Sequence, residues 1–153
     1  GDGGEPLWED GVVASLTHKQ GHVAVVQSRL DQTKGIGIDL ESVAKVRLEF
    51  THRICTESDR ILLEKFPATE QQQILTTIFA AKEALYKCHF PLGAKQFYFQ
   101  DAELDYFEAN KGQLGLKVLR DTSPVTPRGS VTHGFFRQLD LGGLPHILAL
   151  MSL

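Results

Sequence analysis

Alternation of apolar and polar residues dominates the first third of the chain. It predicts two strands, residues 12–18 and 22–27, and Gly21 between them suits the positive φ of a hairpin turn. A third strand is predicted over residues 36–41, after a polar turn. The pattern therefore favours a three-stranded meander at the start of the chain.

Helical spacing replaces this alternation from residue 43 onward. The longest helix is predicted over residues 69–88, where apolar residues recur at three- and four-residue steps. A shorter helix over 57–66 has Thr56 as its N-cap, and a brief helical segment covers 46–50. Strand-like segments return near the C-terminus, at residues 96–99, 114–119, 130–136 and 146–151. The order of strands, helices and strands predicts an α+β fold, with an antiparallel sheet and a long packed helix.

Composition places the chain among ordinary globular domains. Its 153 residues are 42% hydrophobic and 23% charged, which is enough for one domain with a packed core. A net charge of −3 gives no basic surface for nucleic acid, and no apolar run is long enough to span a membrane. Cys55 and Cys88 form no CxxC pair, so we expect a reduced protein in the cytoplasm.

Carboxylates and lysines supply the candidate chemistry. Because side chains alternate along a strand, Asp39 and Glu41 project from the same face. On the long helix, Glu83 and Lys87 are four residues apart and lie one above the other, with Lys82 on an adjacent stripe. If the three carboxylates converge, they need a shared proton or a cation, and Mg²⁺ with a phosphorylated substrate fits best. A lysine nearby would stabilise the departing phosphate oxygen.

Each of these features also has an ordinary structural explanation. A Glu and a Lys at positions i and i+4 of a helix are most often a solvated surface pair. Asp39 and Glu41 could form the wet face of a half-buried strand. His18, which follows Ser15 and Thr17, could bind phosphate oxygens or could be a hydrogen-bonded histidine at a strand end.

Four segments resemble the 4'-phosphopantetheinyl transferase superfamily, specifically its larger class, which serves siderophore, surfactin and related peptide synthetases. Residues 35–41, GIGIDLE, resemble the family's GIDIE strand. Residues 79–87, FAAKEALYK, resemble its [FW]xxKExxxK helix. Residues 4–8 and 15–18 are similar to its GxPxW and S[IL][ST]H segments. Both the order and the spacing of the segments agree with the family.

The resemblance implies a phosphopantetheinyl transferase-like fold and Mg²⁺-dependent transfer of 4'-phosphopantetheine from coenzyme A to a serine of an acyl or peptidyl carrier protein. It makes Asp39, Glu41 and Glu83 the metal ligands. Glu83 and Lys87 become the catalytic residues, with Glu83 acting on the attacking serine and Lys87 on the leaving phosphate. By the same resemblance, coenzyme A contacts fall on Gly4, Glu5, Pro6, Thr17, His18 and Lys82. 

Members of the larger class consist of two similar halves, and most of the first half has no counterpart in this chain. The resemblance implies one domain, in which residues 1–34 end the first half and residues 35–153 form the second half with the metal site. A fragment, a separate polypeptide carrying the first half, and self-association would each account for this. The segment after Glu41, including Val46 and Phe50, corresponds to the region that docks the carrier protein.

Two other functions stay open at this point. The chain could be a catalytically incomplete fragment that binds coenzyme A or the carrier protein without modifying it. It could also be a structural domain whose carboxylates and lysines are surface charges. Asp59 stands where the family usually has a glutamate, which puts a secondary metal or base contact in doubt.

Overall fold

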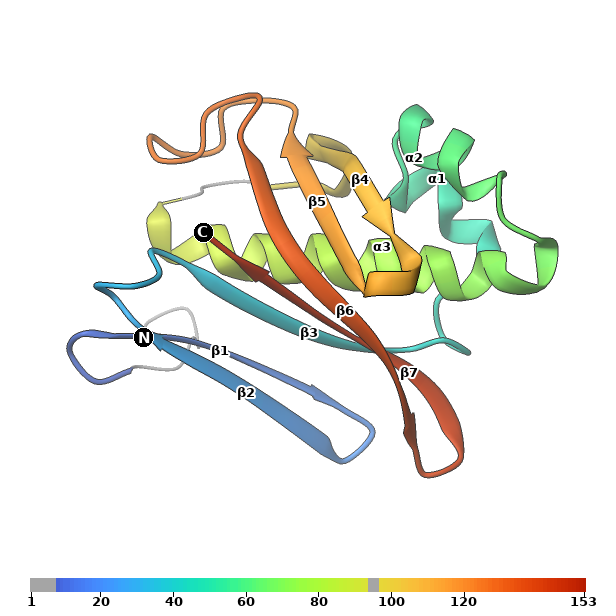
Figure 1. Cartoon of the computed structure of the whole chain (residues 1–153), viewed down its shortest axis with the longest axis horizontal. Coiled ribbons are helices and arrows are strands. Elements are labelled where there is room, and N and C mark those ends of the chain that lie inside the picture. The colour runs from blue at the N-terminus through green and yellow to red at the C-terminus, as the bar shows by residue number, and fades with distance from the viewer. Residues whose placement is uncertain (1–7, 94–96) are drawn as a thin grey trace.

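The computed structural model describes residues 8–93 and 97–153, and in this part of the chain five strands form one antiparallel sheet (Figure 1). The strand order is β3–β7–β6–β5–β4. The bounds are Ile36–Ser42 for β3, Ala102–Glu108 for β4, Gln113–Val118 for β5, Val131–Leu141 for β6 and Leu144–Ser152 for β7. The long helix α3 (Ala68–His89) lies behind this sheet in Figure 1 and covers one of its faces. The α+β fold with an antiparallel sheet and a long packed helix is thus confirmed.

The helix α3 matches the longest helix that the sequence predicts. Its apolar face carries Leu75, Ile78 and Leu85, which are fully buried, and the sheet contributes Leu116 and Ile147 to the same core. Because these residues recur at helical spacing, α3 gains most of its stability from packing on the sheet. No helix in the described part of the chain has both the length and the apolar character that crossing a bilayer requires.

Short helices connect β3 to α3. They are η1 (Leu48–Phe50), α1 (Thr51–Ile54) and α2 (Glu57–Leu63), and three further single turns are η2 (Phe90–Leu92), η3 (Phe99–Asp101) and η4 (Ala109–Lys111). Thr56 caps α2 as predicted: its Oγ1 accepts a hydrogen bond from the Asp59 amide at 3.2 Å. The Asp59 carboxylate in turn accepts from the Thr56 amide at 3.0 Å, which completes a capping box.

The N-terminal hairpin consists of β1 (Val12–Lys19) and β2 (His22–Arg29), which pair with each other in a sheet of their own. The predicted three-stranded meander is therefore wrong, because β3 pairs with β7 instead of with the hairpin. The free edge of β3 is occupied by hydroxyl groups of β1. Ser15 Oγ accepts a hydrogen bond from the Ile38 amide at 3.1 Å, and Thr17 Oγ1 accepts one from the Leu40 amide at 3.2 Å.

The C-terminal strands differ from the prediction at one place. Residues 97–99 contain no strand, and residue 96 lies outside the described residues. The strand of this region is β4, which the alternation did not reveal because its register with β5 shifts between Leu104 and Tyr106. Strands β5, β6 and β7 lie where the sequence predicts them, although β6 is longer than the predicted segment.

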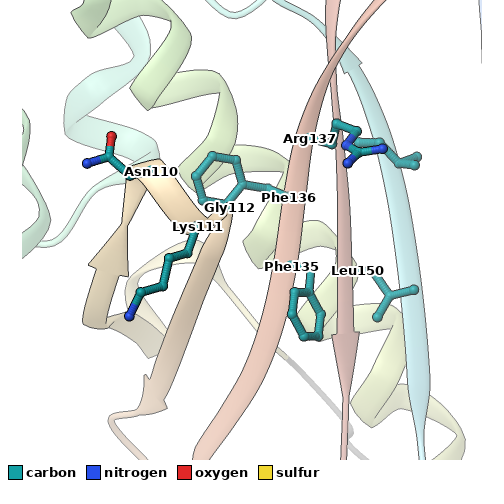
Figure 2. Close-up of a pocket in the computed structure, with 8 residues that line it drawn as sticks. Asn110, Lys111, Gly112, Phe135, Phe136, Arg137 and Leu150 are labelled. Carbon is teal, nitrogen blue, oxygen red and sulfur yellow. The ribbon is translucent and has the colours of Figure 1, made fainter.

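The face of the sheet opposite α3 remains open in places. A cavity of about 410 Å³ lies over β6 and β7, and Phe135 and Leu150 line it together with Lys111 of η4, just before β5 (Figure 2). Phe136, the next residue in β6, stacks on Phe107 and contributes to the core. The alternation of β6 therefore separates a core face from an outer face, and the residues of the predicted site do not line this outer cavity.

Gly37 sets the distance between β3 and α3, and this contact supplies the first testable prediction. A Cβ atom at this position would overlap the Ala84 carbonyl oxygen and would lie 2.6 Å from the Cys88 amide nitrogen. We expect Gly37→Ala to lower the free energy of unfolding by about 2 kcal/mol, because the helix must move off the strand. Chemical denaturation measures the loss. Gln138→Ala is the control, because Gln138 also lies in a strand of the sheet but has an exposed side chain.

Candidate functional site

The contact between β3 and α3 places three carboxylates in one electrostatic environment. Burial raises the pKa of Glu83, and the Asp39 carboxylate raises it further, while Lys87 partly opposes the shift. Burial also raises the pKa of Glu41, to which Asp39 adds, against a hydrogen bond from Lys19. Asp39, Glu41 and Glu83 therefore lie close enough to influence one another's charge, which is the convergence that the sequence analysis considered.

Two lysines neutralise part of this negative charge. Lys87 Nζ lies 2.7 Å from Asp39 Oδ1 and also donates to the Ile38 carbonyl oxygen at 3.1 Å. Lys19 Nζ lies 2.7 Å from Glu41 Oε2. The spacing in the helix predicted that Lys87 would lie against Glu83, whereas the structure pairs it with Asp39 on the neighbouring strand. Three carboxylates and two ammonium groups leave the site with excess negative charge.

The donor set of the site suits a hard cation. Asp39 is 5% exposed, and its Oδ2 atom is buried without a hydrogen-bond partner among the described residues. A buried carboxylate oxygen is costly in this state, and coordination to a divalent cation would satisfy it. Within residues 8–93 and 97–153, however, no three His, Cys, Asp or Glu side chains are arranged so that they could hold a metal ion. The chemistry therefore fits Mg²⁺, but the lysines hold two of the carboxylates.

Thr17 and His18 lie on opposite faces of β1. Thr17 is buried, and its hydroxyl group donates to Asp39 Oδ1 at 3.2 Å. Thr17 Oγ1 itself accepts a hydrogen bond from the Leu40 amide, so the contacts of Thr17 orient both Asp39 and the β3 edge. His18 is exposed, which leaves it accessible to a ligand. Gly4, Glu5 and Pro6, the other expected coenzyme A contacts, lie outside the described residues.

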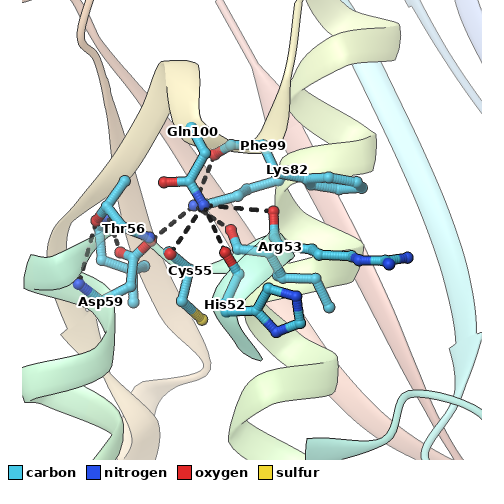
Figure 3. A network of polar contacts seen from close by, with 10 residues as sticks. His52, Arg53, Cys55, Thr56, Asp59, Lys82, Phe99 and Gln100 are labelled. Carbon is cyan, nitrogen blue, oxygen red and sulfur yellow. Dashed lines mark hydrogen bonds and ion pairs between the residues drawn. The ribbon is translucent and has the colours of Figure 1, made fainter. Parts of the chain in front are cut away.

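Lys82 differs most from its expected role. Its side chain is completely buried, and Nζ lies 2.6 Å from Asp59 Oδ2, 2.8 Å from the Ile54 carbonyl oxygen and 2.9 Å from the Phe99 carbonyl oxygen (Figure 3). A lysine donates three hydrogen bonds, and all three are used here. In this arrangement Lys82 has no donor left for a coenzyme A phosphate, so the contact expected from the resemblance is not formed.

Two cavities flank the carboxylates. A cavity of about 410 Å³ adjoins Lys87 and lies between β1 and the end of α3. Its lining is mainly aromatic and aliphatic, with Trp8, Leu16, Tyr86 and Phe90. On the other side, a cavity of about 190 Å³ has Glu83 and Tyr86 in its wall, with three aromatic residues, Phe97, Tyr98 and Phe99. The site thus has room for a bulky ligand on both sides of the charged groups.

Comparison with known proteins identifies the family. The family model described as "4'-phosphopantetheinyl transferase superfamily" matches residues 35–142. This chain belongs to that superfamily. The matched region contains Asp39, Glu41, Glu83 and Lys87, so the carboxylates and one of the lysines lie within the family's common part.

Two curated proteins that are similar to this chain are named 4'-phosphopantetheinyl transferases. PptT of Mycobacterium tuberculosis is 35% identical over 121 residues, which are 78% of this chain and 52% of PptT. Npt of Nocardia iowensis is 32% identical over 106 residues, which are 69% of this chain and 47% of Npt. The chain thus spans about half the length of the curated relatives it matches.

Solved structures confirm the fold. The holo-[acyl-carrier-protein] synthase of Thermotoga maritima superimposes with a TM-score of 0.53 at 24% sequence identity. The match covers 76% of this chain and 62% of that chain. This superposition, together with the long helix that packs on an antiparallel sheet, shows that the chain has the expected phosphopantetheinyl transferase-like fold.

Sequence reasoning missed Lys19 as a residue of the site. It lies at the end of β1, 22 residues before its partner Glu41, and it belongs to none of the motifs. The pairing forms only because hydroxyl groups of β1 bind the edge of β3 and carry Lys19 along with them. The alternation of β1 and β2 contained no signal for this docking.

The raised pKa of Glu83 predicts a pH-dependent stability effect. A carboxyl group whose pKa is higher in the folded protein than in the unfolded chain favours folding when protonated. Its contribution is therefore lost as the pH rises from the ordinary value of 4.5 through the raised value. We expect Glu83→Gln to raise the melting temperature at pH 7, in the presence of a chelator, by about 2 °C.

Thermal unfolding at pH 4 and pH 7 measures this effect, and the gain should shrink at pH 4. Glu9→Gln is the matched control because Glu9 is exposed and lies outside the site. A lower melting temperature for Glu83→Gln at pH 7 would show that ionised Glu83 stabilises the fold.

Proposed function

We propose that this chain carries the catalytic half of a 4'-phosphopantetheinyl transferase. The reaction moves the 4'-phosphopantetheine group of coenzyme A to a serine of an acyl or peptidyl carrier protein and depends on Mg²⁺. The observation that carries this proposal is the group of Asp39, Glu41, Glu83 and Lys87 at the contact between β3 and α3, within the region that matches the family. The division of the chain near residue 35 into parts of two halves is part of the same proposal.

The carboxylates would hold the metal ion. Asp39, Glu41 and Glu83 are the proposed ligands, and the unpartnered Oδ2 atom of Asp39 supports this assignment. When bound, Mg²⁺ supplies positive charge to the diphosphate of coenzyme A. Burial raises the pKa of both Glu41 and Glu83, and the Asp39 carboxylate raises both further, so a bound cation would lower the cost of their charges.

Glu83 would take up the proton of the attacking serine, and Lys87 would stabilise the leaving phosphate. In the reaction, the serine oxygen forms a bond to the β-phosphorus of coenzyme A, the bond from this phosphorus to the bridging oxygen breaks, and 3',5'-ADP leaves. Glu83 accepts the serine proton, directly or through water, and its raised pKa brings it closer to neutral pH, where a general base is most effective. Lys87 donates a hydrogen bond to the leaving phosphate oxygen, and its present contact with Asp39 keeps its ammonium group at the site.

Coenzyme A would occupy the cavity beside Lys87. This cavity has a mainly apolar lining that includes Trp8, Tyr86 and Phe90, which suits the face of a base, and its Lys87 edge suits a phosphate. His18 is exposed on β1 and available for a second phosphate contact. Thr17 acts in this proposal through Asp39 and not on the phosphate.

The carrier protein would approach from the side of Glu41. A cavity of about 320 Å³ next to Glu41 is lined by Phe50 and by the cations Lys45 and Arg53, a combination that suits an acidic partner. Val46 is 5% exposed, so its side chain serves the core, and Phe50 is the more accessible of the two residues expected to dock the carrier.

We place this activity in the cytoplasm, in the biosynthesis of siderophores or other secondary metabolites. Cys55 and Cys88 are free and buried, and burial raises the pKa of both thiols to about 12. Protonated, buried thiols suit a reducing compartment. The second candidate function is binding of coenzyme A or the carrier without transfer. It is favoured by the observation that the match covers only 52% of PptT.

The central test is modification of a carrier protein. The chain is incubated with coenzyme A, Mg²⁺ and an apo carrier protein, and intact-mass spectrometry then reads the carrier. We expect a mass gain of one phosphopantetheine group that disappears with a chelator, which removes the metal ion, and with Glu83→Gln, which removes one of the charges that hold it. Binding of coenzyme A without any mass gain would instead establish the incomplete fragment, and turnover by Glu83→Gln at the wild-type level would contradict the metal assignment.

Lys87 supplies a second kinetic prediction. If it acts mainly on the leaving phosphate in the transition state, Lys87→Ala should lower kcat by about 100-fold while the affinity for coenzyme A falls much less. Steady-state kinetics and a binding titration with coenzyme A separate the two quantities. Lys65→Ala, at an exposed position that lines none of the cavities described here, is the control for general loss of positive charge. A loss of affinity with unchanged kcat would assign Lys87 to ground-state binding.

A further inference from the structure

Lys19 occupies a position at the site that the proposed reaction does not use. Its ammonium group lies 2.7 Å from Glu41 Oε2, and the Glu41 side chain is only 12% exposed in this pair. Among residues 8–93 and 97–153, Lys19 is the one cation that forms an ion pair with Glu41. Glu41 therefore depends on Lys19 for its charge balance.

The hairpin that carries Lys19 is anchored beside the site. Gln20, the next residue, has a φ of 49°, which is uncommon for a residue other than glycine. Its side-chain oxygen lies 2.9 Å from Nε2 of His146, which is fully buried at the start of β7. Figure 1 shows the β1–β2 turn next to the β6–β7 hairpin. Because this contact holds the turn, Lys19 is presented to Glu41 from a fixed position.

We propose that Lys19 is an internal counter-ion of Glu41 that competes with the divalent cation for this carboxylate. The inference rests on the proposed function, since it takes Glu41 as a metal ligand. Lys87 forms the equivalent ion pair with Asp39, but it has a proposed role in the reaction, whereas Lys19 has none. Lys19 thus acts as a positioning residue that balances the charge of Glu41 until the cation binds.

This competition links cation binding to the hairpin. A cation that takes over Glu41 releases the Lys19 ammonium group from its ion pair, so the hairpin loses one of its contacts to β3. Linkage requires the reverse as well: a variant without the ammonium group binds the cation more tightly. Lys19 lowers the affinity for the cation without being one of its ligands.

The experiment is a calorimetric titration of Mn²⁺ into the chain, without coenzyme A or carrier protein. We expect Lys19→Met to bind Mn²⁺ about three- to tenfold more tightly than the wild type, as the loss of one partly buried ion pair implies. In a chelator, Lys19→Met should melt at a lower temperature than the wild type, because Glu41 loses its counter-ion. Lys19→Arg, which retains the charge, should bind Mn²⁺ as the wild type does.

Lys45→Met is the matched control. Lys45 lines the same cavity as Lys19 and Glu41 but is exposed, and no ion pair joins it to Glu41 in the described part of the chain. It should leave Mn²⁺ affinity within about twofold of the wild type. Should Lys19→Met fail to fold, Lys19→Gln replaces it with a polar side chain of similar reach and the same expected gain.

The outcomes separate this inference from the proposed function. Equal or weaker Mn²⁺ binding by both neutral variants overturns the competition while the metal site stands. An equal gain in Lys45→Met also overturns it, since a general charge effect would then explain the result. Absence of Mn²⁺ binding by the wild type and all variants overturns the metal site itself, and with it the role of Lys19.

Discussion

The position of the candidate site depends on a buried ion pair beneath it. Lys82 and Asp59 have fully buried side chains, and their polar atoms bind three other segments: the Ile54 carbonyl at the end of α1, the Phe99 carbonyl in η3 and the Leu104 amide in β4. Removing one partner of such a pair leaves an uncompensated buried charge, at a cost of about 3–5 kcal/mol. The pair therefore fixes where α1, α2, α3 and β4 meet.

Adjacent residues of α3 divide the work between structure and chemistry. Lys82 points into the interior, whereas Glu83 lies at the site, and Lys87 reaches β3 one turn later. Gln100 continues the network at the surface, because its side-chain amide donates to the backbone carbonyls of His52, Arg53 and Cys55 (Figure 3). Phe99 contributes to both parts. Its carbonyl oxygen accepts a hydrogen bond from Lys82, and its ring lines the cavity beside Glu83, with its centroid 5.2 Å from that of the Phe79 ring. A shift of the ion pair would thus move the cavity wall next to Glu83.

Sequence reasoning found the elements whose signals are local. Apolar periodicity located α3, and alternation located β3 and placed Asp39 and Glu41 on one face, whereas the grouping with Glu83 came from the resemblance to the family. The failures involve partners distant in sequence. The burial of Lys82 depends on Asp59, 23 residues away, and the role of Lys19 depends on a hairpin that docks through Ser15 and Thr17. Strand β4 was missed because its bulge interrupts the alternation on which strand prediction rests.

The hydroxyl groups of β1 help to hold the carboxylates of the site close together. A continuous ladder between β1 and β3 would use the Ile38 and Leu40 amides in backbone pairs; here Ser15 and Thr17 bind them instead, and Lys87 takes the Ile38 carbonyl. Side chains from two elements therefore complete the β3 edge, and two of them, Thr17 and Lys87, also donate hydrogen bonds to Asp39. The site keeps carboxylates with raised pKa values and one unsatisfied oxygen, which is unfavourable for stability. The apolar packing of α3 on the sheet offsets this cost, so the fold can hold carboxylates whose charge is not balanced.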